Sequence, residues 1–408
     1  MEAMSSSHRS AKQIEALDAF AEASASGTAY AQLRAAREAD RASRSGLGDG
    51  LSDRQRALLF EAQTLLAMTD MRFGDAEHLA KEAAESWRGA EQHPDELAMR
   101  MAAVTARIGA AYRDTIAVLP LAVKLDHLLT ALAAAAPTRR RLVEGTVQTG
   151  LAHLAVDRVP AARELFARAR SLAGDDVELA RALAVTALCE LQAGNEKGAC
   201  AAAAQAIALA RSTGDHVQLA VLLRFMAGVH GGVQELTEAL EMAEEAADIA
   251  ERVGDVLYAS TLRLRGMLRV TSGRVLEGCA DLERSIGLLS AGAWTYTIPV
   301  EVLTLAQTLV GIGEHARAER LLAEHAEHLA STTGDERAEV DLLRYGVTIR
   351  AGDHARAGAY AENVGRLLAA AHHKDAATLY DAAADAWTIA QEPAHARRCR
   401  AAADLLRG

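Results

Sequence analysis

The stretch that decides the fold reads GDDVELARALAVTALCELQAGNEKGACAAAAQAIALARSTGD and covers residues 174–215. It runs from one Gly-Asp step to the next, and the same step returns at Gly254-Asp255 and Gly334-Asp335. The first three steps are 40 residues apart, and the last follows after 80. Glycine accepts the left-handed conformation that ends many helices, and aspartate caps the helix that follows. The sequence therefore predicts a helical repeat with a period of 40 residues.

A second set of helix breakers lies about halfway between these steps. They are Gly194-Asn195, Gly231-Gly232, Gly273-Arg274, Gly313-Glu314 and Gly352-Asp353. Each repeat is then a pair of helices of roughly 16–18 residues, and the short turns make the two helices antiparallel neighbours. A column of apolar residues is expected on the buried face, eight residues after each Gly-Asp position. Its members are Ala182, Leu222, Leu262, Val302, Leu342 and Ala382.

Upstream of residue 174 the helix-breaking residues are less regularly spaced. The whole chain therefore divides into four predicted segments. These are a disordered N-terminus at 1–9, an N-terminal helical pair with a hinge at 10–52, less regular helical repeats at 53–174, and regular 40-residue repeats at 175–408. The hinge is placed in the glycine-rich stretch Ser45–Gly50. The less regular segment can be drawn as three units, at 53–92, 95–136 and 138–174.

Composition favours packed helices in an intracellular setting. Half of the 408 residues are hydrophobic, only 4% are aromatic and only 6 are prolines. The net charge of −11 argues against a nucleic-acid surface, which needs clustered Lys and Arg. Four cysteines without a CxxC motif suggest a reducing compartment. The N-terminus shows no secretory signal and no apolar run reaches about 20 residues, so we expect a cytoplasmic protein without membrane contact.

Two later segments carry a resemblance to a known family. They read Gly313-Glu314-His315-Ala316-Arg317-Ala318-Glu319 and Gly352-Asp353-His354-Ala355-Arg356-Ala357. With small residues in mid-helix, they resemble tetratricopeptide (TPR) repeats, whose usual period is about 34. The longer period here is similar to that of the sensor domains of large ATP-dependent bacterial transcription activators. The resemblance implies an all-α, right-handed superhelical solenoid whose concave groove binds proteins or peptides.

The sequence offers little catalytic or metal chemistry. It contains no GxSxG, P-loop or HExxH motif. His325 and His328 are three residues apart, but no further ligands accompany them, so neither a metal nor a cofactor is predicted. Cys189 and Cys200 could meet across a turn as a redox pair, although buried small hydrophobes are favoured. The run Arg139-Arg140-Arg141 is interpreted as a solvated face rather than a phosphate contact.

The groove supplies the candidate binding residues. Arg224, Arg263 and Arg344 recur nine or ten residues after the predicted turns, and would form a basic ladder suited to an acidic peptide tail or a carboxylate. In the alternative interpretation, these arginines pair with neighbouring Glu and Asp side chains. The other candidate residues of the groove are Met267, Gln307, Tyr345 and Trp387.

Three functions remain open at this point. The favoured one is a non-catalytic scaffold or adaptor that binds a protein or peptide in the groove, possibly in bacterial regulation, because a repeat solenoid offers a large continuous surface. The first alternative is a regulator that senses a small ligand or signal peptide. The second is an enzyme with a pocket inside the superhelix. The sequence decides neither the partner nor the oligomeric state.

Overall fold

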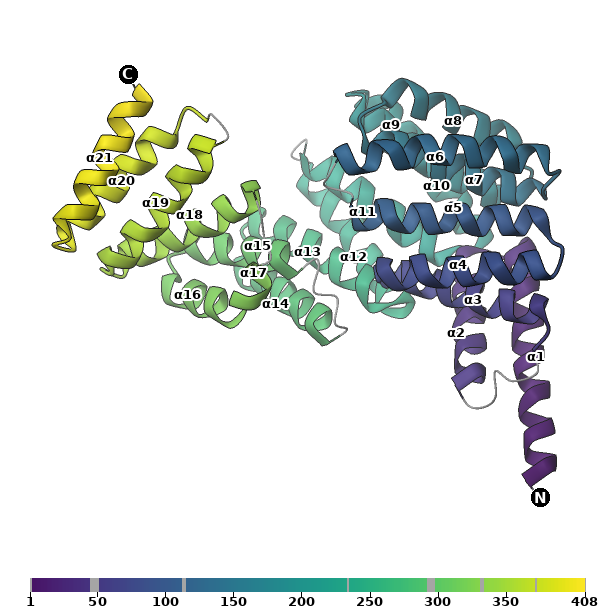
Figure 1. The fold of residues 1–408 in the computed structure, drawn as a ribbon. Coiled ribbons are helices and arrows are strands. Elements are labelled where there is room, and N and C mark those ends of the chain that lie inside the picture. Colours follow the sequence, from purple (N-terminus) through teal and green to yellow (C-terminus); the bar gives the residue numbers. More distant parts are fainter. Residues whose placement is uncertain are drawn as a thin grey trace. The chain divides into compact units, whose positions relative to one another are not determined.

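A computed structural model describes residues 2–44, 51–111, 115–232, 235–291, 298–330, 334–370 and 373–407. Over these ranges the chain is helical, without a β-strand (Figure 1). Its helices are α1 Glu2–Ser26, α2 Ala29–Arg44, α3 Asp53–Thr69, α4 Phe73–Gly89, α5 His93–Ala110, α6 Thr115–Ala134, α7 Arg139–Ala155, α8 Val159–Leu172, α9 Asp176–Gln192, α10 Glu196–Thr213, α11 His216–Gly232, α12 Leu236–Val253, α13 Asp255–Thr271, α14 Val275–Ala291, α15 Ile298–Gly311, α16 His315–Glu324, α17 Ala326–Ala330, α18 Gly334–Arg350, α19 His354–Ala370, α20 Ala376–Ile389 and α21 Pro393–Arg407. The predicted all-α architecture of helix pairs is confirmed.

The turn residues act as the sequence predicted. Asp175 caps α9 by accepting a hydrogen bond from the Glu178 backbone N–H over 2.9 Å. Gly214 ends α10 in the left-handed conformation, with φ of 68°. Asn195 caps α10 at its other end, accepting from the backbone N–H of Gly198. Helix ends in this part of the chain are therefore fixed by local chemistry.

The weaker pattern before residue 174 has a physical cause. Several turns there place a residue other than glycine in the left-handed region: Met71, Glu91, Ala136 and Asp157. Such turns leave no glycine in the sequence to mark them. The helix pairs α3–α4, α5–α6 and α7–α8 nevertheless occupy the three ranges that the sequence analysis drew.

The chain forms two compact units, residues 1–264 (unit 1) and 265–408 (unit 2). The division falls inside α13, whereas the boundaries expected after residues 52 and 174 both lie within unit 1. α1 begins at Glu2, so residues 2–9 are helical where the sequence analysis expected disorder. The proposed hinge at 45–50 lies outside the described residues.

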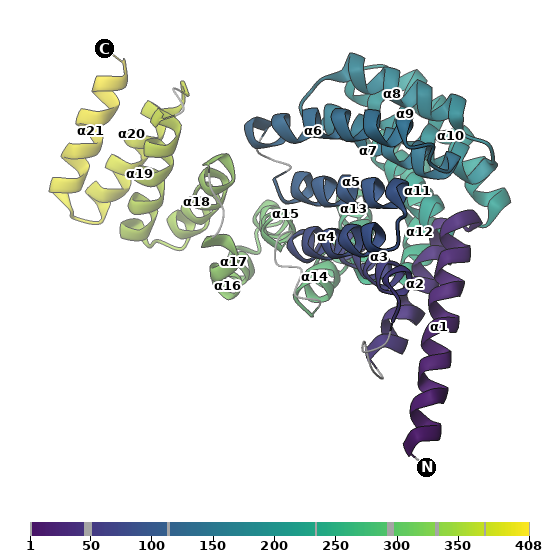
Figure 2. The same cartoon turned by 45° about the vertical axis from the view of Figure 1, so that its right-hand side comes forward.

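Unit 1 is a row of helix pairs with alanine-rich contacts. In both views α4, α5 and α6 lie side by side (Figure 2). One core joins α1, α2 and α3 around Leu17, Phe20 and Leu58, and a second joins α5, α6 and α7 around Met101 and Leu125. Small alanines between the large side chains let neighbouring helices approach closely.

One helix of unit 1 stands out by its composition. Residues 116–134 of α6 are apolar enough, by length and composition, to cross a membrane, although Lys124, Asp126 and His127 interrupt the run. Only 28% of this segment is buried within the protein. The sequence had predicted no segment of this kind.

Unit 2 stacks α18, α19, α20 and α21 side by side. Its apolar cluster contains Ala361, Ala383, Ala384 and Cys399. The predicted buried column holds at Leu262 and Val302 but fails here, because Leu342 is 48% exposed. Its neighbours Val340 and Asp341 are buried instead, so the register of α18 differs from that of the preceding units.

Candidate functional site

The hairpin α1–α2 makes contacts far along the chain within unit 1. At its turn, the carbonyl of Gly27 accepts a hydrogen bond from the Arg140 guanidinium of α7 over 2.8 Å. The Tyr30 and His216 rings meet edge to face, with centroids 5.6 Å apart. On the next turns of α2, Arg37 donates to the Val253 carbonyl over 2.7 Å. The hairpin therefore contacts helix pairs that are not its neighbours in sequence.

These contacts define the side of the row on which the hairpin lies. Helix pairs in a solenoid contact only their neighbours, and the row curves by a small rotation at each pair. A hairpin that packs on α3 and also reaches α7, α11 and the end of α12 must lie on the side toward which the row curves. We call this side the inner face of unit 1.

The inner face holds α2 through the ends of helices. Asp215, at the start of α11, accepts a hydrogen bond from the backbone N–H of Ala29, the first residue of α2, over 3.1 Å. A carboxylate at a helix N-terminus satisfies a free N–H and opposes the positive end of the helix dipole. Arg37 provides the converse interaction at the C-terminal end of α12, where free carbonyls gather. The inner face thus holds α2 by its first N–H and by the side chain of Arg37, in the middle of the helix.

A buried arginine links three further helices beneath the inner face. Arg141 of α7 contacts Glu61 of α3 at 2.7 Å and Asp95 of α5 at 3.0 Å. The Trp87 indole N–H also donates to Glu61, over 3.3 Å. Burial alone would lower the pKa of Arg141, but the carboxylates of Glu61, Glu144 and Asp95 outweigh it and raise that pKa. The Arg141 guanidinium therefore stays charged, and its ion pairs connect α7 to α3 and α5.

The interpretation of residues 139–141 as a solvated face is wrong for Arg140 and Arg141, whereas the Arg139 side chain is 52% exposed. Arg140 is only 7% exposed and Arg141 is enclosed by carboxylates, while Arg139 is paired with Glu178 at 3.1 Å. Glu144, one turn on, is shared with Arg181 of α9. The physical reason is that Arg139 and Arg141 meet acidic residues of neighbouring first helices, while Arg140 pairs with Glu144 of its own helix and donates to the Gly27 carbonyl. A basic triplet at a helix start in an acidic chain was the available signal for this network.

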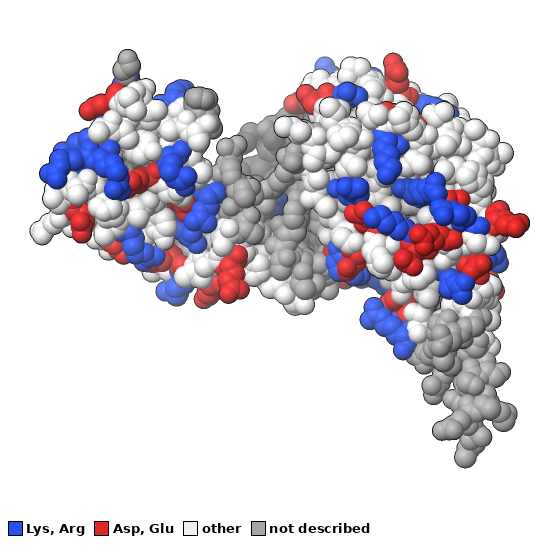
Figure 3. Space-filling model, viewed as in Figure 1, with Lys and Arg blue, Asp and Glu red and all other residues white. Residues whose placement is uncertain are grey.

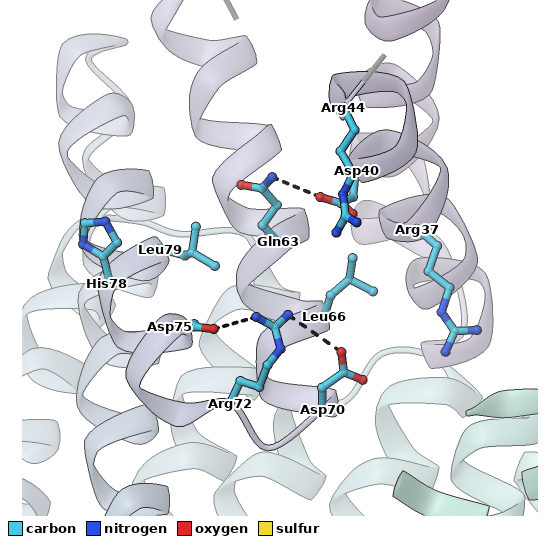
Figure 4. A pocket seen from close by; sticks show the side chains of 10 residues that line it. All are labelled: Arg37, Asp40, Arg44, Gln63, Leu66, Asp70, Arg72, Asp75, His78 and Leu79. Carbon is cyan, nitrogen blue, oxygen red and sulfur yellow. Dashed lines mark hydrogen bonds and ion pairs between the residues drawn. The ribbon is translucent and has the colours of Figure 1, made fainter. Parts of the chain in front are cut away.

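A pocket of about 420 Å³ opens between α2, α3 and α4 (Figure 4). Arg72 lies between Asp75 and Asp70, at 2.6 and 3.8 Å, and Gln63 donates to Asp40 over 3.1 Å. Its lining residues are Arg37, Asp40, Arg44, Gln63, Leu66, Asp70, Arg72, Asp75, His78 and Leu79. The charges of this pocket are largely paired with one another, which suits hydrogen bonding to a polar chain more than binding of a single ion.

The predicted basic ladder has two members in unit 1. Arg224 of α11 has its Nε buried without a hydrogen-bond acceptor. Burial lowers the pKa of Arg224, and the positive charge of Arg263 on α13 lowers it further. The structure therefore brings these two arginines close enough to repel each other. An anion placed there would relieve both the repulsion and the missing hydrogen bond.

The candidates in unit 2 have other roles. Arg344 pairs with the buried Asp341 at 3.6 Å and lies over the Tyr360 ring, as the alternative interpretation expected. Tyr345 and Trp387 pack against the apolar cluster of this unit. Gln307 donates to Glu339 over 2.5 Å, and Met267 is 41% exposed.

The remaining sequence candidates stay apart from these sites. All four cysteines are free thiols, and Cys189 is buried. The rings of His325 and His328 lie 5.7 Å apart. Within the residues that the structure describes, no three or more His, Cys, Asp or Glu side chains gather as a metal site.

No family model matches the chain. No curated protein matches it either. Solved structures do share its fold. The apo form of RapI is 13% identical, covers 86% of this chain and 97% of its own, and has a TM-score of 0.52. The apo form of the quorum sensor NprR from B. thuringiensis is 15% identical, covers 86% and 98%, and has a TM-score of 0.50.

A third solved structure covers less of its own length. It is the signal-transduction ATPase with a tetratricopeptide repeat sensor from Pyrococcus horikoshii, which is 12% identical with a TM-score of 0.59. The match covers 83% of this chain and 53% of that protein. At these identities the likeness concerns the fold, and the chain has the fold of TPR-like helical repeat proteins.

Proposed function

We propose that this protein is a non-catalytic scaffold or adaptor that binds a protein or peptide partner on unit 1, through Arg224 of α11, the helix whose start contacts the α1–α2 hairpin. One observation carries the proposal. Arg224 presents a buried guanidinium whose Nε lacks an acceptor, with the charge of Arg263 nearby. A carboxylate from a partner would complete this pair, because charge-assisted hydrogen bonds to arginine are the strong ones.

The way in which the inner face holds α2 supports a helical or acidic peptide as the partner. It already contacts a helix through an N-terminal N–H and a side-chain guanidinium. A partner helix with an acidic residue would use the same kinds of contact. The free thiols agree with a reducing cytoplasm as the place where binding occurs.

A sensing regulator is the second candidate function. Two of the similar structures are described as a quorum sensor and as a protein with a repeat sensor. In this chain, a signal molecule that competed for Asp215 or Arg140 would displace the α1–α2 hairpin. Binding and a change in the position of the hairpin would then be coupled.

Affinity capture from a source lysate tests the proposal. Arg224→Glu should lose the bound partners, since the anion site is reversed in charge. Arg168→Glu is the matched control, because Arg168 is an exposed arginine of α8 in the same unit. Circular dichroism establishes that both variants are folded. If Arg224→Glu captures the same partners with unchanged affinity, Arg224 is not the proposed binding residue.

A further inference from the structure

Helix α6, the second helix of its pair, carries an apolar surface in addition to its core contacts. Val118, Ala122, Leu125 and Leu129 of α6 are buried in the core with α5 and α7. They form one stripe of the helix. A helix of a globular protein normally turns charged or polar residues to the other side.

A second, adjoining side of α6 is apolar over the first half of the helix, before Asp126, His127 and Thr130. Ile116 is 85% exposed, Leu119 38% and Val123 39%, and they follow one another at spacings of three and four residues. Pro120 is exposed between them. The other large exposed hydrophobic residues of unit 1, Leu188 and Val221, are on separate helices. A helix that is apolar on both sides is normally covered on both, so the exposed stripe is an unpartnered contact surface.

A groove with excess positive charge lies beside this stripe. It has a volume of about 310 Å³ between α4, α5 and α6. Its floor contains Ala84, Ala103, Val104 and Leu128, and its basic residues are Lys81, Arg88, Arg100, Arg107 and Lys124. Figure 3 shows basic and acidic side chains interspersed over α4 and α5, below a band over α6 that carries few charges.

The nearby carboxylates do not neutralise these cations. Lys81 and Arg107 share Glu77, at 2.6 and 3.7 Å. Arg88 and Arg100 share Glu96, at 2.9 and 2.6 Å. Across the described parts of the chain Lys124 has no ion pair, and Glu85 is the one further carboxylate in the lining. Five cations thus face three carboxylates, in a chain whose overall charge is −11.

We propose that this surface, formed by the exposed stripe of α6 and the α4–α6 groove, docks an acidic amphipathic helix of a partner protein. The stripe would cover the apolar face of that helix, and its carboxylates would meet Lys124 and the arginines of the groove. This is a helix-in-groove contact, in which anchors recur every three or four residues. A recessed groove between three helices suits a helix more than it suits the plane of a membrane. The site lies apart from Arg224 and does not depend on the function proposed above.

Binding of model helices to the full-length protein tests this proposal. The probes are two labelled amphipathic peptides with the same leucine positions, one with glutamates and one with lysines on the polar face. Fluorescence anisotropy should show binding of the acidic helix that weakens as salt rises, and much weaker binding of the basic one. Ile116→Glu should weaken binding about tenfold or more, and Lys124→Glu about threefold to tenfold.

Two variants on other helices serve as controls. Leu276→Glu replaces an equally exposed leucine of α14, and Lys197→Glu an exposed lysine of α10, so neither should change the affinity. The proposal is overturned if the protein binds both peptides equally or neither. It is also overturned if Ile116→Glu instead abolishes binding to phosphatidylglycerol vesicles, which would identify a membrane surface, or dissolves a homodimer in light scattering.

Discussion

The carboxylate of Asp215 accepts a hydrogen bond from the backbone N–H of Ala29 over 3.1 Å, although 186 positions separate the two residues. Asp215 also caps its own helix, accepting from the Gln218 N–H over 3.2 Å, and is 3% exposed. The carboxylate of Asp215 therefore caps the N-termini of two helices, α11 and α2. The position of Asp215 in the repeated Gly-Asp steps predicted that it caps α11. The hydrogen bond to Ala29 depends on the curvature of unit 1.

Asp215→Ala should free the N-terminal hairpin. We expect a loss of about 1–2 kcal/mol of unfolding free energy, as for other helix caps, and faster amide exchange in residues 29–32. Hydrogen exchange with mass spectrometry measures both. Asp353→Ala is the matched control, because Asp353 caps α19 by accepting from the Arg356 N–H, a contact within its own helix turn. Equal exchange in residues 29–32 of the two variants would contradict a clamping role for Asp215.

Arg141→Leu should be among the most destabilising changes in unit 1. It leaves Glu61 and Asp95 without their cation, and removing one partner of a buried ion pair typically costs about 3–5 kcal/mol. Arg163→Leu is the comparison, since Arg163 pairs with Glu190 but is 51% exposed, where solvent screening leaves such pairs with little effect on stability. Denaturant unfolding gives the two values. Similar losses of unfolding free energy for both variants would show that the buried ion pairs of Arg141 do not stabilise unit 1 more than an exposed pair does.

Glu96 should make unit 1 sensitive to acid. Burial raises the pKa of Glu96, but Arg88, His93 and Arg100 together outweigh burial and lower it below 4.5. The folded state thus favours the charged form, and this stabilisation is present above the ordinary pKa and lost as pH falls through the lowered value. The stability gap between wild type and Glu96→Gln should shrink from pH 7 to pH 3. Urea titrations at both pH values check this, and a constant gap would contradict it.

The four thiols should differ in reactivity. Burial is the main cause that raises the pKa of Cys189 and Cys279, and burial together with Glu362 raises the pKa of Cys399 to about 11. Cys200 is only half-buried. Since the thiolate is the reactive form, iodoacetamide at pH 8 should label Cys200 first and Cys399 last. Peptide mass spectrometry after timed labelling gives the order, and early labelling of Cys399 would contradict it.

The candidate residues of the groove show which features of the site can be predicted from the sequence and which cannot. The regular spacing of Arg224, Arg263 and Arg344 is visible in the sequence, and the first two do lie close together. Arg344, however, is engaged by the buried Asp341, because the register of α18 differs from that of earlier helices. Trp387, an aromatic residue of the predicted groove, is half-buried and packs against the apolar cluster of unit 2. A periodic position shows which helix a residue is on, but not whether that face is covered.

The sequence by itself determined the repeat, the helix pairs and many helix ends. These depend on hydrogen bonds between residues three to four positions apart and on caps such as Asp175 and Gly214, so a local pattern is enough to specify them. Only the tertiary structure decided that Asp215 meets Ala29, that Arg141 meets Glu61, and that α6 keeps an apolar stripe exposed. Those outcomes depend on small rotations between successive helix pairs, which accumulate over the length of unit 1 and leave no periodic mark in the sequence.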